Sequence, residues 1–172
     1  FGNPSSLHKL GIEAQLVMDN ARKNVASALN VPPETVYFTS GATESSNLAI
    51  RGAAGAYGKR KKRVITTTVE HSSVKEAFNR LGDEGYEVIR ISPGKDGKFS
   101  VKDFTDAVND DTCLISVMLV NNETGELLPV KNIFAEAKRK NKDIITHCDA
   151  VQAFMKIPVK PVVIQADLIS MS

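Results

Sequence analysis

The sequence predicts an α/β protein with a doubly wound, mainly parallel sheet that carries helices on both faces. Short β-branched, apolar runs alternate along the chain with longer segments whose apolar residues recur every three or four positions. Right-handed crossovers between parallel strands place such helices on the faces of one sheet. Polar or small residues follow several expected strands, at the sheet edge where open α/β proteins bind ligands.

Composition places the chain among ordinary globular proteins. Its 172 residues suit one domain, 42% of them are hydrophobic and 24% are charged. No apolar run approaches the roughly 18 residues of a membrane helix. A net charge of +2 favours neither nucleic acid nor an anionic membrane, so we expect no direct contact with either.

Cysteine usage and the first residue bear on location and completeness. Cys113 and Cys148 both fall inside expected buried strands, so we expect them to be reduced core residues of a cytoplasmic protein. The chain opens at Phe1 rather than Met, which leaves open whether earlier residues are missing.

The first expected elements are a helix, a strand and a second helix. In residues 10–29 the apolar positions have helical spacing, and two prolines follow at 32 and 33. Residues 36–39 read as a first strand. A turn at residues 40–45 then leads into a helix that reaches about Tyr57.

The turn after this first strand holds Gly41, Ala42 and Thr43 at a helix start. Small residues there expose backbone N–H groups that can bind an anion such as phosphate. The alternative is a simple helix start that Ser40 or Thr43 caps.

A basic run at residues 59–63 reads as a solvated helix end, because Lys and Arg are favoured at helix C-termini. A nuclear or nucleic-acid patch is the alternative. Neither interleaved aromatic residues nor a second basic block accompanies the run.

Two strands and two helices are expected next. Residues 64–68 form a strand, and a helix begins at residues 70–73. Residues 86–91 read as an edge strand, because the turn after them carries no reactive group. Ser100 with Asp103 resembles the capping box of a short helix.

His71 lies just past the strand at residues 64–68. Most lone histidines are structural, but at this place the imidazole could stack on a ring or shuttle a proton.

The last third repeats the alternation of strands and helices. Residues 113–120 form a strongly apolar strand that leads to Asn122, and residues 129–141 form a helix. Residues 144–149 read as a central strand, and residues 166–172 as the final one.

Asp149 ends the central strand, with Gln152 three residues later. A carboxylate there can hold a proton on a heterocyclic nitrogen, as enzymes that use a pyridinium electron sink require. The alternative is that Asp149 caps the next helix.

These candidates all follow strand ends, so the fold is expected to gather them at one edge of the sheet. A phosphate cradle, a ring-stacking imidazole and a carboxylate for a ring nitrogen together describe a site for pyridoxal 5'-phosphate (PLP). The set comprises Gly41, Thr43, His71, Asn122, Asp149, Gln152 and Ser172.

Five motifs in this order resemble the cysteine desulfurases of the NifS/IscS type, in the class V aminotransferase branch of the fold-type I PLP enzymes. Together they cover essentially the whole chain. The motifs are residues 1–6 with His8, 38–45, 70–74, 121–125 and 147–152.

The resemblance implies an enzyme that uses PLP to convert L-cysteine to L-alanine and passes the sulfur on as a persulfide. It implies a cytoplasmic homodimer, a partner such as an iron–sulfur scaffold or another acceptor that serves tRNA thiolation, and no metal. It places His71 over the cofactor ring as a catalytic residue and Asp149 at the pyridine nitrogen. The remaining positions are Ala42, Thr43 and Ser172 at the phosphate, and Asn122 and Gln152 near the phenolic oxygen.

The sequence departs from the family pattern at its ends. The Schiff-base lysine of the family comes a few residues after the serine that matches Ser172, and the persulfide cysteine and the small C-terminal domain come later. Neither Cys113 nor Cys148 matches the persulfide position. We therefore expect residues 1–172 to be part of the large, PLP-binding domain, without the family's N-terminal segment, and to be inactive alone.

Two alternatives stay open from the sequence. One is a related enzyme, either a selenocysteine lyase or an aminotransferase for small amino acids. The other is a non-catalytic binding or assembly module that keeps a cofactor-like cleft.

Overall fold

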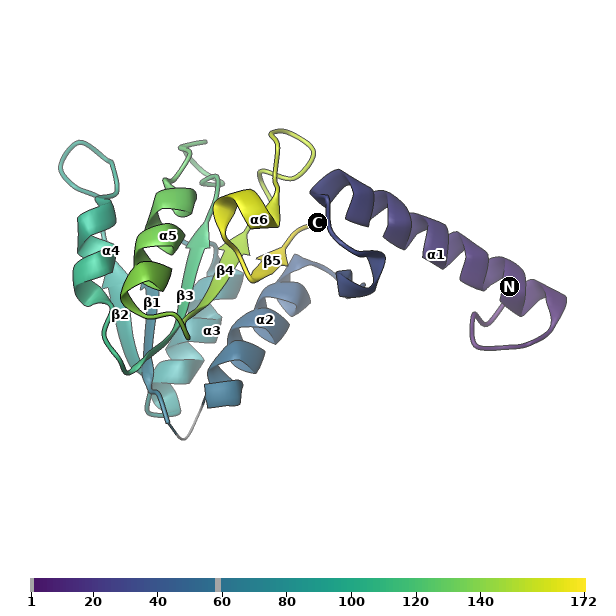
Figure 1. Ribbon diagram of the computed structural model, residues 1–172, viewed down its shortest axis with the longest axis horizontal. Coiled ribbons are helices and arrows are strands. Elements are labelled where there is room, and N and C mark those ends of the chain that lie inside the picture. The colour runs from purple at the N-terminus through teal and green to yellow at the C-terminus, as the bar shows by residue number, and fades with distance from the viewer. Residues whose placement is uncertain (1, 58–59) are drawn as a thin grey trace. The chain divides into compact units, whose positions relative to one another are not determined.

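The computed structural model describes residues 2–57 and 60–172 and contains two compact units (Figure 1). The first unit ends at Phe38, and the second covers Thr39–Ser172. No helix in these described residues combines the length and the apolarity that crossing a bilayer requires.

Helix α1 (Lys9–Leu29) dominates the first unit and confirms the helix predicted for residues 10–29. At its start, Nδ1 of His8 accepts a hydrogen bond from the backbone N–H of Gly11 at 3.3 Å. At its end, Asn30 adopts the left-handed conformation, with φ of 58°. A 3-10 turn, η1 (Pro33–Thr35), follows.

The strand predicted for residues 36–39 is wrong. The backbone N–H of Val36 donates to the carbonyl of Pro33 at 3.1 Å, and the Val36 carbonyl accepts from the Arg22 guanidinium. That guanidinium lies 4.9 Å from the centre of the Phe38 ring. A strand needs a hydrogen-bonded neighbour, and no strand of the described residues pairs with this segment.

A five-stranded parallel sheet forms the centre of the second unit, in the order β2-β1-β3-β4-β5. The chain runs from β1 outward to β2 and returns to the other side of β1 with β3. The strand order therefore reverses between β1 and β3, and open sheets bind ligands at such a reversal. The strands are β1 (Arg63–Thr67), β2 (Glu87–Ile91), β3 (Thr112–Met118), β4 (Ile145–Asp149) and β5 (Leu168–Ser170).

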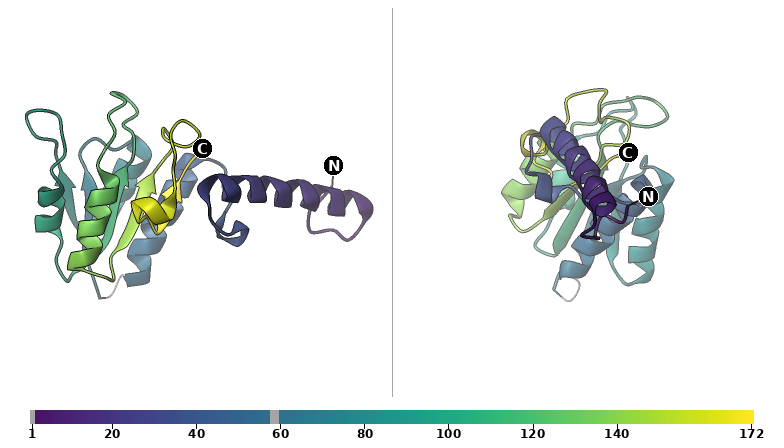
Figure 2. Two further views of the ribbon diagram at one scale, coloured as in Figure 1. Left: turned by 45° about the horizontal axis from the view of Figure 1, so that its top comes forward. Right: turned by 90° about the vertical axis from the view of Figure 1, so that its right-hand side faces the viewer.

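Helices cover both faces of the sheet, which confirms the predicted fold class. Helices α2 and α3 pack together on one face, and α4, α5 and α6 lie on the other (Figures 1 and 2). Strand β2 is an edge strand, as predicted. The helices are α2 (Ala42–Tyr57), α3 (Ser72–Asp83), α4 (Val101–Ala107), α5 (Val130–Lys140) and α6 (Pro161–Ile164).

The core lies on both sides of β3, in which all seven residues are buried. Ile50 of α2 and Phe78 of α3 pack against Leu114 on one side. On the opposite side of the sheet, Phe104 and Phe134 are fully buried. This packing makes the middle of the sheet a rigid platform for the loops at its end.

The basic run differs from its prediction as a helix end. Helix α2 ends at Tyr57, Lys59 lies outside the described residues, and Arg63 begins β1. Lys61 pairs with Asp143 at 3.2 Å and Arg63 with Glu87 at 2.8 Å. These partners come from distant parts of the chain, so the run alone does not indicate them.

The capping box predicted at Ser100 is also wrong. Ser100 occupies the N-cap position of α4, but its side chain makes no capping hydrogen bond. The backbone carbonyl of Ser100 accepts from the N–H of Asp103 at 3.2 Å instead.

Candidate active site at the carboxyl edge of the sheet

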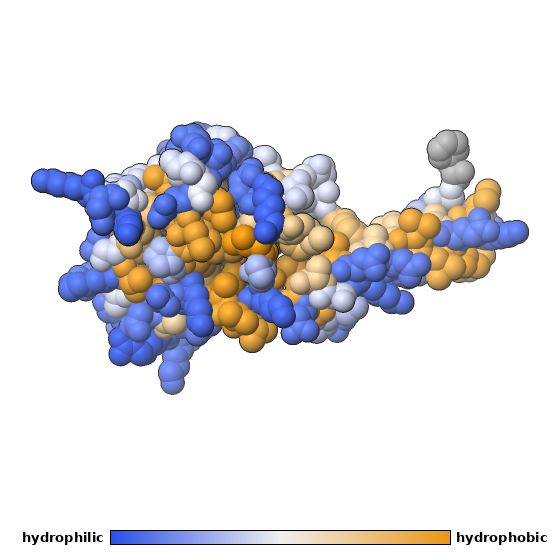
Figure 3. All heavy atoms as spheres, turned by 90° about the horizontal axis from the view of Figure 1, so that it is seen from above, coloured by the Kyte–Doolittle hydropathy of each residue, from blue (hydrophilic) through white to orange (hydrophobic). Residues whose placement is uncertain are grey.

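The residues that follow β1, β3, β4 and β5 lie at one edge of the sheet, which we call the carboxyl edge (residues 68–71, 119–129, 150–160 and 171–172). Figure 3 views this edge of the second unit from above, with apolar residues gathered at its middle and hydrophilic residues around them. His71 follows β1, Asn122 follows β3, Asp149 ends β4 and Ser172 follows β5. Parallel pairing therefore brings these predicted residues to the same edge.

Asp149 is only 5% exposed. Its Oδ1 accepts the backbone N–H of Val151 at 3.0 Å, and Oδ2 accepts no hydrogen bond from the described residues. Burial raises the pKa of this carboxyl, while the Val151 hydrogen bond and the nearby His71 oppose the rise. Residues 151–156 form turns, so the alternative that Asp149 caps a helix is wrong.

His71 is the N-cap of α3 and is exposed. Its Nδ1 accepts the backbone N–H of Ser73 at 3.3 Å and lies 2.9 Å from the Ser73 hydroxyl. A neutral ring that accepts at Nδ1 carries its proton on Nε2. The capping role therefore uses Nδ1 and leaves Nε2 available.

Sequence reasoning missed Glu70, which is 1% exposed. Its Oε1 accepts the Thr67 hydroxyl at 2.8 Å and the backbone N–H of Met118 at 3.0 Å. Its Oε2 is buried without a partner among the described residues. Burial, helped by the nearby Asp149 carboxylate, raises the pKa of Glu70 to about 8. The Met118 partner lies 48 residues away along the chain, so the sequence near Glu70 gave no signal of this contact.

Asn121, the neighbour of the predicted site residue Asn122, organises the loop after β3. The Oδ1 of Asn121 accepts the backbone N–H groups of Glu123 and Thr124, each at 2.9 Å. Its Nδ2 donates to the carbonyl of Val69 at 3.2 Å and so ties this loop to the one that carries His71. Asn122 is exposed. Its side chain is therefore accessible to a ligand.

Gln152, the second residue expected near a phenolic oxygen, is half-buried. Its Oε1 accepts from Nζ of Lys156 at 2.8 Å, one turn further along the chain. This hydrogen bond engages the Gln152 side chain but does not connect it to the other candidate site residues.

The start of α2 presents backbone donors that have no partner among the described residues. The N–H groups of Ala42, Thr43 and Glu44 have no acceptor within the helix. A Cβ added at Gly41 would meet no atom within 4 Å, so the space before the helix is open.

The alternative prediction that Ser40 or Thr43 caps α2 is wrong. Neither side chain makes a capping hydrogen bond within the described part of the chain. The Glu44 carboxylate accepts the backbone N–H of Ser40 at 2.6 Å instead. Hydrogen bonding from the side chain of Ser40, and then from its backbone N–H, lowers the pKa of Glu44.

A buried chain of hydrogen bonds joins the end of β5 to α2. Ser45 Oγ lies 3.2 Å from Ser170 Oγ, which lies 2.9 Å from Nε2 of His147, and Nδ1 of His147 lies 2.8 Å from Ser116 Oγ. Burial lowers the pKa of His147 to about 4, so the ring is neutral. This series of hydrogen bonds fixes Ser170 beside the first turn of α2. Ser170 lies two residues before Ser172.

Both cysteines are free and buried. Burial raises the pKa of Cys113 to about 11 and that of Cys148 well above 9. Both thiols therefore stay protonated near neutral pH and are poor nucleophiles, which agrees with their expected place in the core.

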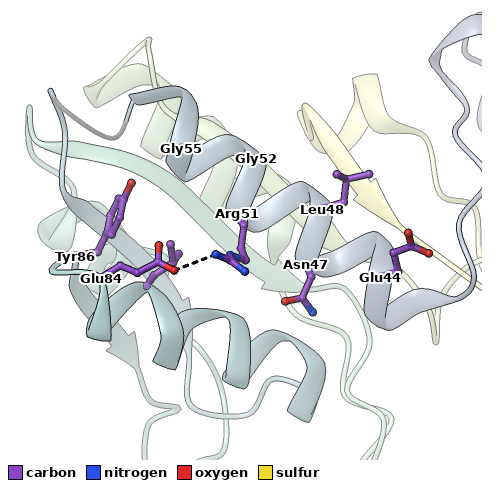
Figure 4. Close-up of a pocket in the computed structure, with 9 residues that line it drawn as sticks. Glu44, Asn47, Leu48, Arg51, Gly52, Gly55, Glu84 and Tyr86 are labelled. Carbon is purple, nitrogen blue, oxygen red and sulfur yellow. Dashed lines mark hydrogen bonds and ion pairs between the residues drawn. The ribbon is translucent and has the colours of Figure 1, made fainter.

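A groove of about 570 Å³ lies between α2 and the segment from α3 to β2 (Figure 4). Arg51 and Glu84 pair across it at 3.0 Å, and Tyr86 lines one end. Asp149 and His71 do not line it. We therefore place the candidate site at the carboxyl edge, not in this groove.

Comparison with known proteins agrees with this architecture. The structure resembles a solved "NifS-like protein" with a TM-score of 0.95 and 39% identity, over 98% of this chain and 46% of that one. It also resembles a structure described as "SspA in complex with cysteine", with a TM-score of 0.94 and 34% identity, over 100% of this chain and 49% of that one.

Similarity at the level of sequence extends over the whole chain. A mitochondrial cysteine desulfurase of Saccharomyces cerevisiae is 44% identical in an alignment of 173 positions that covers 100% of this chain and 34% of that protein. The chain thus spans between a third and a half of the length of these relatives. The family model "Aminotransferase class-V" matches residues 1–172. The chain therefore belongs to the class V aminotransferase family.

Proposed function

We propose that this chain forms much of the large, PLP-binding domain of a longer cysteine desulfurase, which converts L-cysteine to L-alanine and passes the sulfur on as a persulfide. One observation carries the proposal: the buried Asp149 carboxylate has a free Oδ2 at the carboxyl edge, close to His71. Similarity to a named cysteine desulfurase supports the reaction, and a relative solved with cysteine supports the substrate.

The residues present fit PLP at both ends of the cofactor. A buried carboxylate with one free oxygen suits a protonated ring nitrogen. The free N–H groups and the open space at the start of α2 suit a phosphate. We assign Asp149 to the ring nitrogen, His71 to the ring face, Ala42, Thr43 and Ser172 to the phosphate, and Asn122 and Gln152 to the phenolic oxygen.

PLP, when bound, supplies an electron sink for the Cα of an amino acid substrate. Asp149 would keep that sink effective, because an anion in a poorly hydrated site favours a proton on the nitrogen beside it. His71 would hold or move a proton at Nε2, since Nδ1 is occupied by Ser73. The series of hydrogen bonds from Ser116 to Ser45 would hold the end of β5 next to the start of α2, the two segments assigned to the phosphate.

We also propose a homodimer in the cytoplasm that hands sulfur to an iron–sulfur scaffold or to a tRNA-thiolation acceptor. Two buried, unpaired cysteines support a reducing compartment. The dimer and the acceptors rest on the resemblance to the family.

Substitution of Asp149 in the full-length protein tests the function. Asp149→Ala should lower alanine formation from cysteine by about a hundredfold or more and alter the visible spectrum of bound PLP. The matched control is Asp106→Asn, which removes an exposed carboxylate of α4 and should change neither. An unsubstituted protein that binds no PLP and forms no alanine would contradict the function. Activity of Asp149→Ala within a few-fold of the parent would contradict only the assigned role.

A further inference from the structure

Strands β1 and β3 separate before they reach the candidate site. Their pairing extends from Arg63 only to Ile65 and Ile115, while β3 continues to Met118. Past that point, the backbone N–H of Met118 donates to a side chain, Oε1 of Glu70, at 3.0 Å. The Glu70 carboxyl group thus replaces a strand-to-strand hydrogen bond at the place where the sheet opens.

The turn that carries Glu70 is fixed from two sides. Thr67 donates its hydroxyl to Oε1 of Glu70 at 2.8 Å and accepts the backbone N–H of Val69 at 3.2 Å. Asn121 holds the Val69 carbonyl from the other side, at 3.2 Å. His71 is the next residue, so its backbone position depends on these contacts.

Glu70 is also coupled to Asp149. Met118, which binds Oε1 of Glu70, is the direct partner of Asp149 in the β3–β4 ladder. The two carboxyl groups lie close enough for the charge of Asp149 to raise the pKa of Glu70. Burial, together with the charge of Asp149, therefore favours the neutral form of Glu70.

We propose that Glu70 is a positioning residue whose neutral carboxyl group bridges the β1 turn to β3 and so holds His71 beside Asp149. The proposal rests on the proposed function, because His71 and Asp149 are the residues assigned to the cofactor ring.

The surroundings of Glu70 explain which carboxyl group keeps the proton. Glu70 is 1% exposed and Asp149 is 5% exposed with a free oxygen, so Glu70 is the more strongly desolvated of the two. From β4 it faces Asp149 and the protonated Cys148. The hydrogen bonds from Met118 and Thr67 and the charge of Lys75 of α3 favour its ionised form, but burial outweighs them. The pKa of about 8 fits a protonated Glu70 at neutral pH.

Three variants of the full-length protein separate these roles. Glu70→Gln keeps an oxygen that can accept from Met118 but cannot ionise, whereas Glu70→Ala removes the bridge. The control is Glu76→Gln, an equivalent change on the exposed side of α3. Glu70→Ala should weaken PLP binding by about tenfold or more, and the other two should stay within about twofold of the parent near neutral pH.

A double-mutant cycle tests whether Glu70 acts through His71. If it does, Glu70→Ala combined with His71→Ala should bind PLP about as weakly as His71→Ala alone. Additive losses would overturn the proposed route through His71. Parent-like PLP affinity in Glu70→Ala would overturn the positioning role itself.

The protonation of Glu70 can be measured without cofactor or activity. Infrared difference spectra of the apoprotein, taken from about pH 6 to about pH 10, should show the C=O band of a protonated carboxyl group that disappears with a midpoint near pH 8. Glu70→Gln should lack this band, and Glu76→Gln should keep it.

A missing band in the parent would overturn the neutral Glu70 whether or not the protein binds PLP. The parent protein and the Glu70 variants could all bind PLP and form alanine equally well. That result would reject this inference and leave the proposed function standing.

Discussion

At the scale of single residues, His71 has two separable roles. Its Nδ1 caps α3 by accepting the Ser73 N–H, and its ring nitrogen Nε2 is the one proposed to act on the cofactor or substrate. Asparagine is a good N-cap but cannot replace an imidazole as an acid or base. Substitution by Asn and by Ala therefore distinguishes the two roles.

We predict that His71→Asn keeps the stability of α3 but lowers desulfurase turnover by about a hundredfold. His71→Ala should lose the same turnover and, in addition, about 1 kcal/mol of unfolding free energy, because the cap is lost. Urea denaturation and alanine formation from cysteine measure the two effects. Parent-like turnover of His71→Asn would make the histidine purely structural.

At the scale of elements, the regular parts of the sheet were predictable and the contacts between loops were not. The β-branched and apolar runs located all five strands, because such residues suit a buried pleated surface. The edge position of β2 was predicted from the turn after it, which carries no reactive group. The apolar run at residues 36–39 failed, because periodicity does not report whether a neighbouring strand exists to pair with it.

The same limit explains which site residues were found. Asp149 and His71 were predictable because parallel strands bring their carboxyl ends to one edge. Glu70 and Asn121 were not, because their partners, Met118 and Val69, lie about fifty residues away in sequence. A buried side chain that joins two loops has no local signal.

The loop after β3 provides a test at this scale. We predict that Asn121→Ala destabilises the protein by about 1–3 kcal/mol, because the buried amide binds two N–H groups of its own loop and the Val69 carbonyl. Asn122→Ala removes an exposed side chain and should leave stability within about 0.5 kcal/mol of the parent. Urea unfolding of both variants measures the difference. Equal stabilities would show that Asn121 does not organise the loop.

At the scale of the whole molecule, two buried groups make stability depend on pH in opposite directions. Glu70 has its pKa raised from 4.5 to about 8, so its contribution is present below pH 4.5 and is lost as the pH rises toward 8. His147 has its pKa lowered from 6.5 to about 4, so its contribution is present above pH 6.5 and is lost as the pH falls toward 4. Asp149, with a raised pKa, acts in the same direction as Glu70.

These opposite dependences should largely offset each other between pH 4.5 and 6.5, where both groups bind different numbers of protons in the folded and unfolded states. Above pH 6.5 His147 is neutral in both the folded and the unfolded state. Of this pair, only Glu70 then still makes the stability depend on pH. One proton changes the unfolding free energy by about 1.4 kcal/mol per pH unit. The stability of the protein should therefore decline most clearly between pH 6.5 and 8.

We predict that the unfolding free energy falls by about 2 kcal/mol across this interval and that Glu70→Gln removes the fall, because Gln cannot ionise. His147→Gln should keep the fall above pH 6.5 and extend it into the acidic range, since the opposing contribution is gone. Glu76→Gln should behave like the parent protein. Urea denaturation at a series of pH values measures all four proteins. A decline in Glu70→Gln as steep as that of the parent would assign the pH dependence to other groups and place Glu70 in its ionised form throughout.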